Sequence, residues 1–466
     1  MRDPLPSKSK SKPKQEPETK PKAPGPRQPP APRRATAATA DFAAFAATAP
    51  GLEQLAAFEL RRLGLTAARA EPGGASFRAT PEGVQRANLW LRTAERVLLR
   101  ISHFRADSFA LLEQKARQVD WARWLRPGAR VALSVTCHKS RLYHSAAVAE
   151  RVAGAIDGQV AGIEWLRLGE LAPDHDPDLD GDGDGGGEGG VQGVRAGGAA
   201  AMAQRVFVRL DHDACALSLD SSGERLHRRG YRRAIGEAPL RETLAAAVAL
   251  SGGLQPRVPG LGRKGDDAAA AGHWLLDPMC GAGTIPIEAL RLLCNVAPGR
   301  ERAFAFQSWP SHEAARWQEL RARARAAELA PPGDFRIEGR DIDGRAIAAA
   351  RLNAAQAGIP EGLIEWRVAE LEALPRAATA GLVISNPPYG RRLGEARALR
   401  AFYRRVGAIL RERRPGSRLS LLLPEAGGFD ALHGLPLEAR FTSKNGGIPV
   451  ALFTGELSGG GRASSR

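Results

Sequence analysis

The stretch of sequence that decides the fold is HWLLDPMCGAGTIPIEA, at residues 273–289. An apolar run ends at Asp277, two glycines follow at Gly281 and Gly283, and a helix-forming sequence comes next. Glycine lets the backbone pass close to a ligand, and the start of the helix points its N–H groups toward that ligand. The stretch therefore predicts a strand, a turn and a helix that together form a nucleotide-type pocket.

The glycine turn lacks the marks of a phosphate site. No lysine follows the glycines as it does in a P-loop, and no third glycine completes the dinucleotide fingerprint. The pocket is therefore expected to take a ligand without phosphate groups.

Two further strand-like runs, at residues 335–340 and 363–368, each lead to an acidic residue. Asp341 follows the first run, at the place where an α/β sheet holds the carboxylate that binds a ribose diol. Glu370 follows the second run, and its carboxylate can accept a hydrogen bond from an adenine amine. Both residues are expected to line the same pocket as the glycine turn.

The apolar run 381–385 is followed by Asn386-Pro387-Pro388-Tyr389. Because proline has no N–H, the strand ends here, and the Asn386 amide and Pro387 carbonyl stay outside any sheet ladder. These acceptors can orient the exocyclic amine of a flat ring, and Tyr389 can stack on that ring. The alternative is a tight turn between strand and helix, because Asn-Pro and Pro-Pro mark turns in many proteins.

These four segments, in this order, resemble the class I methyltransferases that use S-adenosylmethionine and act on an exocyclic amine. The resemblance implies a seven-stranded, Rossmann-like α/β domain that continues with a helix at 402–410, a strand at 418–424 and a hairpin arm at 444–453. Asn445-Gly446 is expected to supply the positive φ of that hairpin. S-adenosylmethionine is the implied cofactor, and its implied binding residues are Thr243, Asp277, Pro278, Cys280, Gly281, Gly283, Thr284, Asp341 and Glu370. The implied catalytic residues are Asn386, Pro387, Pro388 and Tyr389.

The length and charge of the chain indicate several domains and a polyanionic partner. At 466 residues with 43% apolar content, the chain can bury two or three cores. Its formal charge is +16, and residues 1–35 hold ten Lys or Arg against three acidic residues, a net of +7. About +9 therefore belongs to the rest of the chain, which favours nucleic acid or an anionic surface as the partner.

The four cysteines, Cys137, Cys215, Cys280 and Cys294, are far apart and form no C-x-x-C pair. Neither a zinc site nor a disulfide framework is therefore expected, which fits a reducing cytoplasm. The N-terminus has no apolar signal region, and no run approaches the ~18 apolar residues of a membrane span. We expect a soluble cytoplasmic protein without a bound metal or membrane contact.

Three segments have compositions that cannot bury enough apolar surface to fold. Residues 1–40 are a Pro- and Lys-rich basic tail, and residues 457–466 are a Gly- and Ser-rich tail. Residues 172–200 are an acidic, Gly-rich insertion. The insertion begins like a calcium loop at Asp176, but its twelfth position is Gly187, so a disordered insertion is favoured.

The region from 41 to 215 mixes helices and strands. It contains an amphipathic helix at 52–64, and later a strand at 130–137, a basic turn and a helix at 146–156. This order resembles the THUMP RNA-binding domain joined to its small ferredoxin-like partner. The resemblance implies that Lys139, Arg141 and His144 bind phosphates, helped by the helix N-terminus. The alternative is a solvated charged turn.

Residues 216–240 are expected to link this region to a methyltransferase domain at 241–456. The linker carries a basic run, 227–233, centred on Tyr231. Such a run can follow an RNA backbone and stack a base, or its arginines can form salt bridges between the domains. The first interpretation makes RNA contacts of Arg228, Arg229, Tyr231 and Arg232.

The segments LDSSGERLHRRGYR, APLRETLAAA, DPMCGAGT and NPPYG together resemble the bacterial THUMP-containing guanine-N2 methyltransferases of large-subunit ribosomal RNA. The resemblance spans about residues 41 to 455 and implies methyl transfer to the exocyclic N2 of a guanine in 23S rRNA. A tRNA guanine-N2 methyltransferase and a non-catalytic ribosome assembly factor remain alternatives. A DNA adenine-N6 enzyme shares Asn-Pro-Pro-Tyr, but the THUMP-like half argues against it. The sequence does not predict the oligomeric state.

Overall fold

The structure is a computed structural model that describes Met1 and residues 42–65, 67–168, 202–232, 240–256, 274–331, 333, 335–389, 396–425, 432 and 434–458. The two tails and the acidic insertion expected from the sequence lie outside these residues, apart from Met1, Leu457 and Ser458. Within the described residues, no helix combines the length and the apolar character that a membrane crossing requires.

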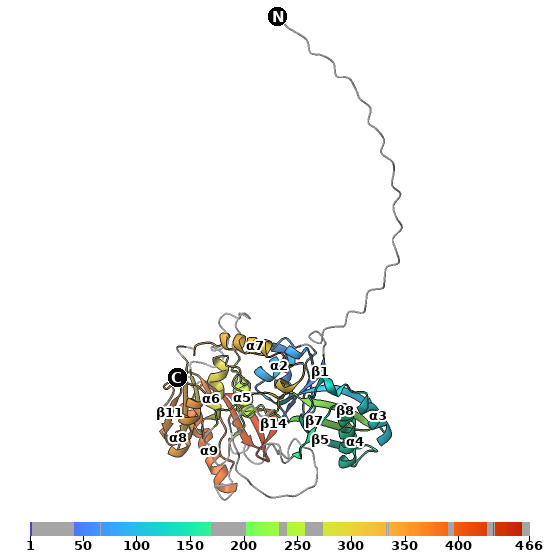
Figure 1. The fold of residues 1–466 in the computed structure, drawn as a ribbon. Helices are drawn as coiled ribbons and strands as arrows, with labels where there is room; N and C mark the ends of the chain where they lie inside the picture. Colours follow the sequence, from blue (N-terminus) through green and yellow to red (C-terminus); the bar gives the residue numbers. More distant parts are fainter. Residues whose placement is uncertain are drawn as a thin grey trace, which may run out of the picture. The chain divides into compact units, whose positions relative to one another are not determined.

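The first half of the chain forms an eight-stranded sheet with the strand order β2-β3-β1-β4-β8-β7-β5-β6 (Figure 1). The long strand β4 joins its two halves, because it pairs with β1 on one side and β8 on the other. The strands are β1 Phe42–Thr48, β2 Arg69–Glu71, β3 Gly74–Ala79, β4 Ala94–Arg105, β5 Arg130–His138, β6 Glu164–Trp165, β7 Gln204–Asp211 and β8 Ala214–Asp220. The helices are α1 Glu53–Arg62, α2 Pro81–Trp90, α3 Phe109–Arg117, the short η2 Trp121–Arg123 and α4 Ser145–Asp157.

Local sequence signals explain the limits of these elements. Helix α2 begins where the Thr80 side chain accepts a hydrogen bond from the Gly83 N–H, and Pro81 occupies its first position. Strand β8 continues to Asp220, so the first sheet extends five residues beyond the limit of 215 expected from the sequence.

The second half forms a seven-stranded sheet with the order β11-β10-β9-β12-β13-β15-β14. This confirms the predicted class I methyltransferase fold. The strands are β9 Trp274–Asp277, β10 Arg336–Asp341, β11 Glu365–Val368, β12 Leu382–Ser385, β13 Arg418–Pro424, β14 Leu437–Asn445 and β15 Ile448–Glu456. The helices are α5 Glu242–Ser251, α6 Thr284–Leu293, α7 Ala314–Ala326, α8 Gly344–Gln356 and α9 Ala396–Arg413, with the short η5 Ala305–Ser308 and η6 Leu371–Ala373.

Five strands of this sheet, β11, β10, β9, β12 and β13, are parallel neighbours. Their carboxyl ends therefore meet at one edge, where ligands bind in open α/β sheets. Asp277, Asp341, Val368 and Ser385 are the last residues of four of these strands.

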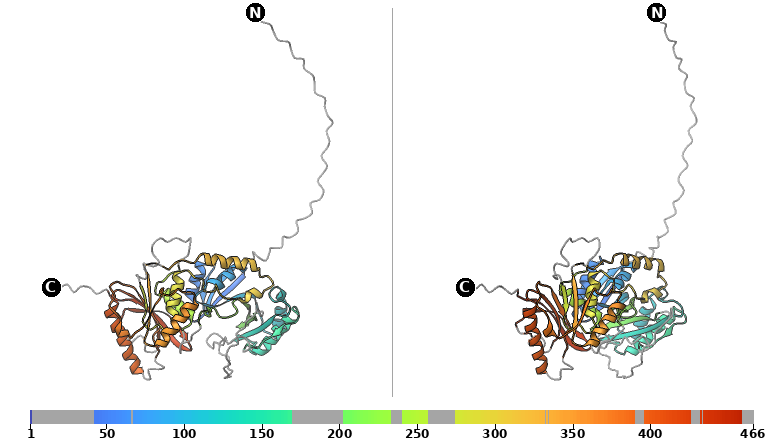
Figure 2. Two further views of the ribbon diagram at one scale, coloured as in Figure 1. Left: turned by 60° about the vertical axis from the view of Figure 1, so that its left-hand side comes forward. Right: turned by 90° about the vertical axis from the view of Figure 1, so that its left-hand side faces the viewer.

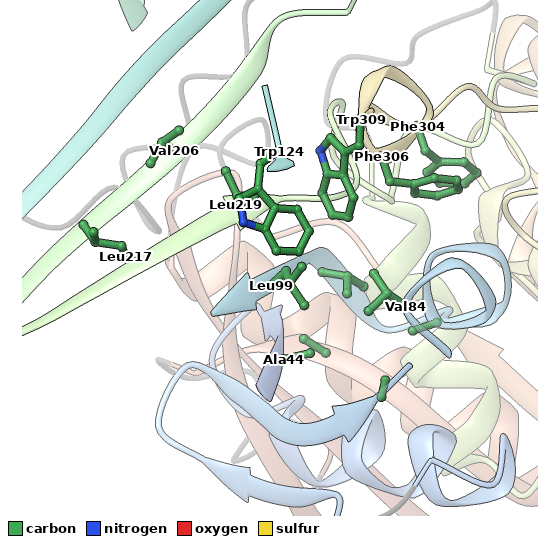
Figure 3. Close-up of a cluster of buried hydrophobic side chains, with 14 of the residues drawn as sticks. Ala44, Val84, Leu99, Trp124, Val206, Leu217, Leu219, Phe304, Phe306 and Trp309 are labelled. Atoms are coloured by element: carbon green, nitrogen blue, oxygen red, sulfur yellow. The ribbon is translucent and has the colours of Figure 1, made fainter. Parts of the chain in front are cut away.

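The N-terminal half of the chain and the methyltransferase half each contribute side chains to the core of the other. The segment between α6 and β10 sends Phe304, Phe306, Trp309 and Trp317 into the core of the first half. Trp309 packs edge-on against Trp124 at 5.3 Å between ring centroids, and its indole N–H donates to Gln204 Oε1 at 2.7 Å. Figure 3 shows Trp309 and the two phenylalanines beside Trp124, Val84 and Leu99.

Helix α7 belongs to the same segment and lies against the ferredoxin-like part, beside α2 (Figures 1 and 2). An ion pair of 3.5 Å between Arg323 and Glu82 joins the two helices. In return, Ala49 and Leu52 of the N-terminal half belong to the core around α5 and α6. No local pattern in the sequence indicates this exchange of core residues.

Candidate active site

The strand ends at the edge of the sheet are joined by side-chain hydrogen bonds. The Ser385 hydroxyl, at the end of β12, donates to Asp277 Oδ1 at 2.7 Å, and the Met279 N–H donates to the same oxygen at 3.2 Å. Asp277 is buried, with 1% of its surface exposed, and burial raises its pKa to about 7. Asp277 thus connects the start of the glycine turn to the residue before Asn386.

Asp341 holds the other side of the glycine turn. Its Oδ2 accepts from the Gly281 N–H at 2.9 Å, and its Oδ1 accepts from the Asp343 N–H at 2.9 Å. Its backbone carbonyl accepts from the Ala369 N–H at 3.0 Å, which brings the segment that contains Glu370 alongside. The Asp341 side chain is half-buried, so it is accessible to a ligand.

The two glycines of the turn serve different purposes. Gly283 has φ +81°, and a Cβ there would lie 2.6 Å from the Trp366 ring, so packing excludes any side chain. Gly281 has φ +51°, and a Cβ there would meet nothing within 4 Å. The open side of Gly281 lets a ligand approach the backbone closely.

The remaining residues implied to bind the cofactor differ in exposure. Pro278 is buried, Cys280 is 8% exposed and Thr284 is 7% exposed. Burial raises the pKa of the Cys280 thiol well above its usual range, so this cysteine stays protonated. Glu370 is exposed just before η6.

Two apolar side chains at this edge did not emerge from the sequence. Ile342 is 69% exposed and Val368 is 59% exposed, although large aliphatic residues are usually buried. Val368 pairs with Asp341 in the sheet, and Ile342 directly follows Asp341. In the sequence, the apolar Ile342 directly after the expected ribose carboxylate could have indicated these residues. A flat base beside a ribose is usually bound between apolar side chains.

Asn386 and Tyr389 are held against each other. The Tyr389 hydroxyl donates to Asn386 Oδ1, and Asn445 Nδ2 donates to the Tyr389 oxygen at 3.3 Å. The Tyr403 hydroxyl of α9 donates to the Pro388 carbonyl at 3.0 Å. Pro387 is buried. Burial also raises the pKa of Tyr389, so the Tyr389 hydroxyl keeps the proton that it donates to Asn386.

Asn445 is part of this arrangement because the hairpin turn lies one residue further on than predicted. Gly446 and Gly447 have the positive φ values, +58° and +78°, whereas Asn445 is the last residue of β14. The expectation that Asn445-Gly446 supplies the positive φ is therefore correct only for Gly446. Asn445 keeps its side chain free to reach Tyr389.

Thr243 is not placed as predicted. It has no exposed surface, and its hydroxyl donates to Glu95 Oε1 at 2.6 Å, on β4 of the N-terminal half. The hydroxyl of Thr243 is thus used in a contact between the halves, and this contact gives no support to its predicted role in cofactor binding.

Two of the linker residues predicted to contact RNA are buried in the structure. Arg229 is 3% exposed and Tyr231 is 2% exposed, so neither can reach RNA. The Tyr231 hydroxyl donates to Glu288 of α6 at 3.0 Å. The Arg232 guanidinium pairs with Glu242 at 3.0 Å and donates to Thr284 Oγ1 at 3.2 Å.

Arg229 lies as the alternative interpretation expects, because it donates to the Arg92 carbonyl of the first half and lies 4.0 Å from Glu288 of α6. Arg232 is largely buried by its contacts with α5 and α6. Arg228 is half-buried and lies 3.8 Å from Glu224. Of the four predicted linker contacts, Arg228 is the one whose side chain remains substantially exposed.

The basic turn after β5 is exposed. Lys139, Arg141 and His144 are all at the surface, with His144 directly before α4. The Arg141 side chain lies 3.7 Å from Asp107 and 4.0 Å from Asp213. Tyr143, which was not singled out from the sequence, is 70% exposed and packs against the His144 ring at 4.1 Å between centroids. These side chains are accessible to a large ligand.

Comparisons with known proteins agree with this architecture. Residues 267–452 match the RMKL-like methyltransferase domain family, and residues 43–98 match the RlmL ferredoxin-like domain. The chain is 33% identical over 420 residues to the Synechocystis protein slr0064, which is named for a proposed RNA methyltransferase activity. The alignment covers 89% of this chain and 96% of that protein. The chain belongs to the RMKL-like methyltransferase family.

A second relative of the family is the ribosomal RNA large subunit methyltransferase K/L of Methylococcus capsulatus, 34% identical over 419 residues. That alignment covers 88% of this chain but 50% of the relative, so the chain spans about half the length of the K/L proteins. A solved structure, SMU.472 in complex with S-adenosylhomocysteine, is 27% identical with a TM-score of 0.70. The alignment covers 90% of this chain and 98% of SMU.472.

The family and its structural relatives establish S-adenosylmethionine as the methyl donor. The residues present fit this cofactor. Gly281 offers an open approach, Asp341 a half-exposed carboxylate, and Ile342 and Val368 an exposed apolar surface. The predicted ferredoxin-like domain is confirmed, and the THUMP assignment of the region after it stays a prediction.

Proposed function

We propose that this RMKL-like methyltransferase methylates RNA, at the exocyclic N2 of a guanine in 23S rRNA. The hydrogen bond between Ser385 and Asp277 carries the proposal, because it fixes Asn386 beside the loop that fits the methyl donor. The names of the K/L relatives and the formal charge of +16 support RNA as the substrate.

S-adenosylmethionine, when bound, supplies an electrophilic methyl group on a sulfonium. In this proposal Asp341 would hold its ribose, Glu370 its adenine amine, and Asp277 with the Gly281 turn its methionine end. Ile342 and Val368 would cover the faces of the base. No metal is needed, because the sulfonium already activates the methyl group.

Asn386 orients the substrate amine. An amide oxygen has two lone pairs, so Asn386 Oδ1 can accept from the Tyr389 hydroxyl and from the guanine amine together. The Pro387 carbonyl would accept the second amine N–H. This arrangement aims the nitrogen lone pair at the methyl group, and positioning of this kind can supply much of a rate enhancement.

With the cofactor bound, the amine nitrogen would accept the methyl group, the sulfur would keep the electron pair of the broken carbon–sulfur bond in S-adenosylhomocysteine, and the alkylated amine would release its proton to water. No strong base is required, because the proton becomes acidic after the nitrogen is alkylated. The guanine must leave its stack at a cost of a few kcal/mol, which stacking on Tyr389 would offset.

The direct test is methylation of unmodified 23S rRNA and tRNA transcripts with radiolabelled S-adenosylmethionine. Mass spectrometry of nuclease digests would then identify the modified nucleoside. We expect N2-methylguanosine in the rRNA, and Asn386→Ala should abolish its formation while calorimetry shows unchanged cofactor binding. Methylation of tRNA alone would favour a tRNA enzyme, and cofactor binding without transfer to either RNA would favour an assembly factor.

A further inference from the structure

Helix α9 carries three exposed arginines for which the described part of the chain shows no ion pair. Arg397, Arg400 and Arg404 are exposed, and in the described part of the chain none of them has an acidic partner. Their spacing of three and four residues places them on one face of the helix, about 4.5 and 6 Å apart along its axis. We call these three residues the α9 arginine stripe.

The stripe differs from the other arginine-rich helix, α7. There Arg316 pairs with Glu313, Arg323 with Glu82 and Arg325 with Glu301, each at 3.5 Å. Helix α9 has no acidic residue before Glu412, so its first four turns offer no internal partners. Three neighbouring cations repel one another, and they need an anion from outside the helix to offset that cost.

The stripe lies next to the loop formed by Asn386-Pro387-Pro388-Tyr389. Tyr403, one turn after Arg400, is fully buried and donates its hydroxyl to the Pro388 carbonyl at 3.0 Å. The opposite face of α9 packs through Val406 and Leu410 on the sheet. The helix is therefore fixed at both places, and the stripe cannot move away from Asn386-Pro387-Pro388-Tyr389 without breaking these contacts.

We propose that the α9 arginine stripe binds the phosphates that flank the target nucleotide, an inference that rests on the proposed function. A base held at Asn386 leaves its own backbone outside the pocket, and α9, which contacts the Pro388 carbonyl through Tyr403, presents three guanidinium groups without an acidic partner among the described residues. Guanidinium groups match phosphate geometry well. The methyltransferase domain would thus supply its own RNA contact, separate from the basic turn at Lys139 and Arg141.

The test compares two variants that remove the same charge. Arg397→Gln/Arg400→Gln/Arg404→Gln removes the stripe, and Arg316→Gln/Arg323→Gln/Arg325→Gln removes three exposed arginines of α7. Binding to an unmodified 23S rRNA transcript is measured over a range of salt concentrations, and methyl transfer is measured at limiting and saturating RNA. Thermal unfolding and S-adenosylmethionine binding show that each variant is folded.

The stripe variant should bind the transcript about 10- to 100-fold more weakly, with a salt slope smaller by about 2, because each phosphate contact contributes ~0.7–0.9. Transfer at saturating RNA should stay near the wild-type rate, so the loss appears in KM. The α7 variant should bind within about threefold of wild type.

Three results would overturn the proposal. Unchanged RNA binding by the stripe variant would show that the phosphates lie elsewhere and leave the face for an acidic protein partner. An equal loss in both variants would show that only the total charge matters. A wild-type protein that neither binds nor methylates the transcript would overturn the proposed function, and the stripe with it, whereas the first two results leave that function intact.

Discussion

The Ser385 hydroxyl donates a 2.7 Å hydrogen bond to Asp277 Oδ1, and both side chains are buried. The two residues are 108 positions apart and end the neighbouring parallel strands β12 and β9. This bond joins the loop that fits the methyl donor to the loop that would hold the acceptor amine.

Ser385→Ala should therefore lower activity and stability together. Loss of a buried hydrogen bond to a carboxyl group costs roughly 1.5–3 kcal/mol in the free energy of unfolding, and the Asn386 loop loses its anchor. Ser420→Ala is a matched control, because Ser420 is also buried and donates to the Val248 carbonyl at 2.8 Å, away from the site. Urea unfolding and single-turnover methylation would compare them, and equal losses of activity would count against the anchoring role.

Asp277→Asn tests the burial of the carboxyl group. Burial raises the folded pKa from 3.8 to about 7, so the folded state binds the proton more tightly than the unfolded chain. The contribution of Asp277 to stability is thus full below pH 4 and is lost as the pH rises through 7. Both known donors, Ser385 and Met279, bond to Oδ1, and an asparagine oxygen can accept both.

The unfolding free energy of the variant minus that of the wild type should therefore increase by about 3 kcal/mol from pH 5 to pH 8. Urea titrations of both proteins at these two pH values measure the difference. A difference independent of pH would mean that Asp277 ionises normally.

Substitutions at Tyr389 separate its hydrogen bond from its ring. Tyr389→Phe removes the donor to Asn386 but keeps the aromatic ring, and should reduce the transfer rate about three- to tenfold. Tyr389→Ala also removes the proposed stacking surface, worth ~1–3 kcal/mol per base, and should weaken RNA binding as well. If both variants bind RNA as the wild type does, the ring does not stack on the base.

Substitutions at Tyr231 and Arg141 should affect different properties, namely stability at Tyr231 and RNA binding at Arg141. Tyr231→Phe removes the buried hydrogen bond to Glu288, and should lower the unfolding free energy by about 1 kcal/mol without changing the salt dependence of RNA binding. Arg141→Gln should leave stability nearly unchanged and reduce the salt slope by about 1, because its side chain is exposed. A change of slope in Tyr231→Phe would contradict the structural role assigned to it.

The sequence determined the order and position of the elements that carry the chemistry. Residues 274–289 read as strand, glycine turn and helix because adjacent residues set that pattern, and Asp341 and Asn386 were found because each follows an apolar strand. Parallel strands place their carboxyl ends together, so the convergence of Asp277, Asp341 and Asn386 on one edge follows from local patterns.

The tertiary structure alone decided the roles of residues whose partners lie far away in the chain. Tyr231 reads as a surface aromatic among arginines, yet Glu288 and α6 bury it. Thr243 reads as a pocket residue, yet its partner is Glu95, 148 positions earlier. Phe304 and Trp309 lie within the methyltransferase half but complete the core of the other half. Burial depends on what packs against a side chain, and no local spacing encodes a contact between segments that meet only in the folded chain.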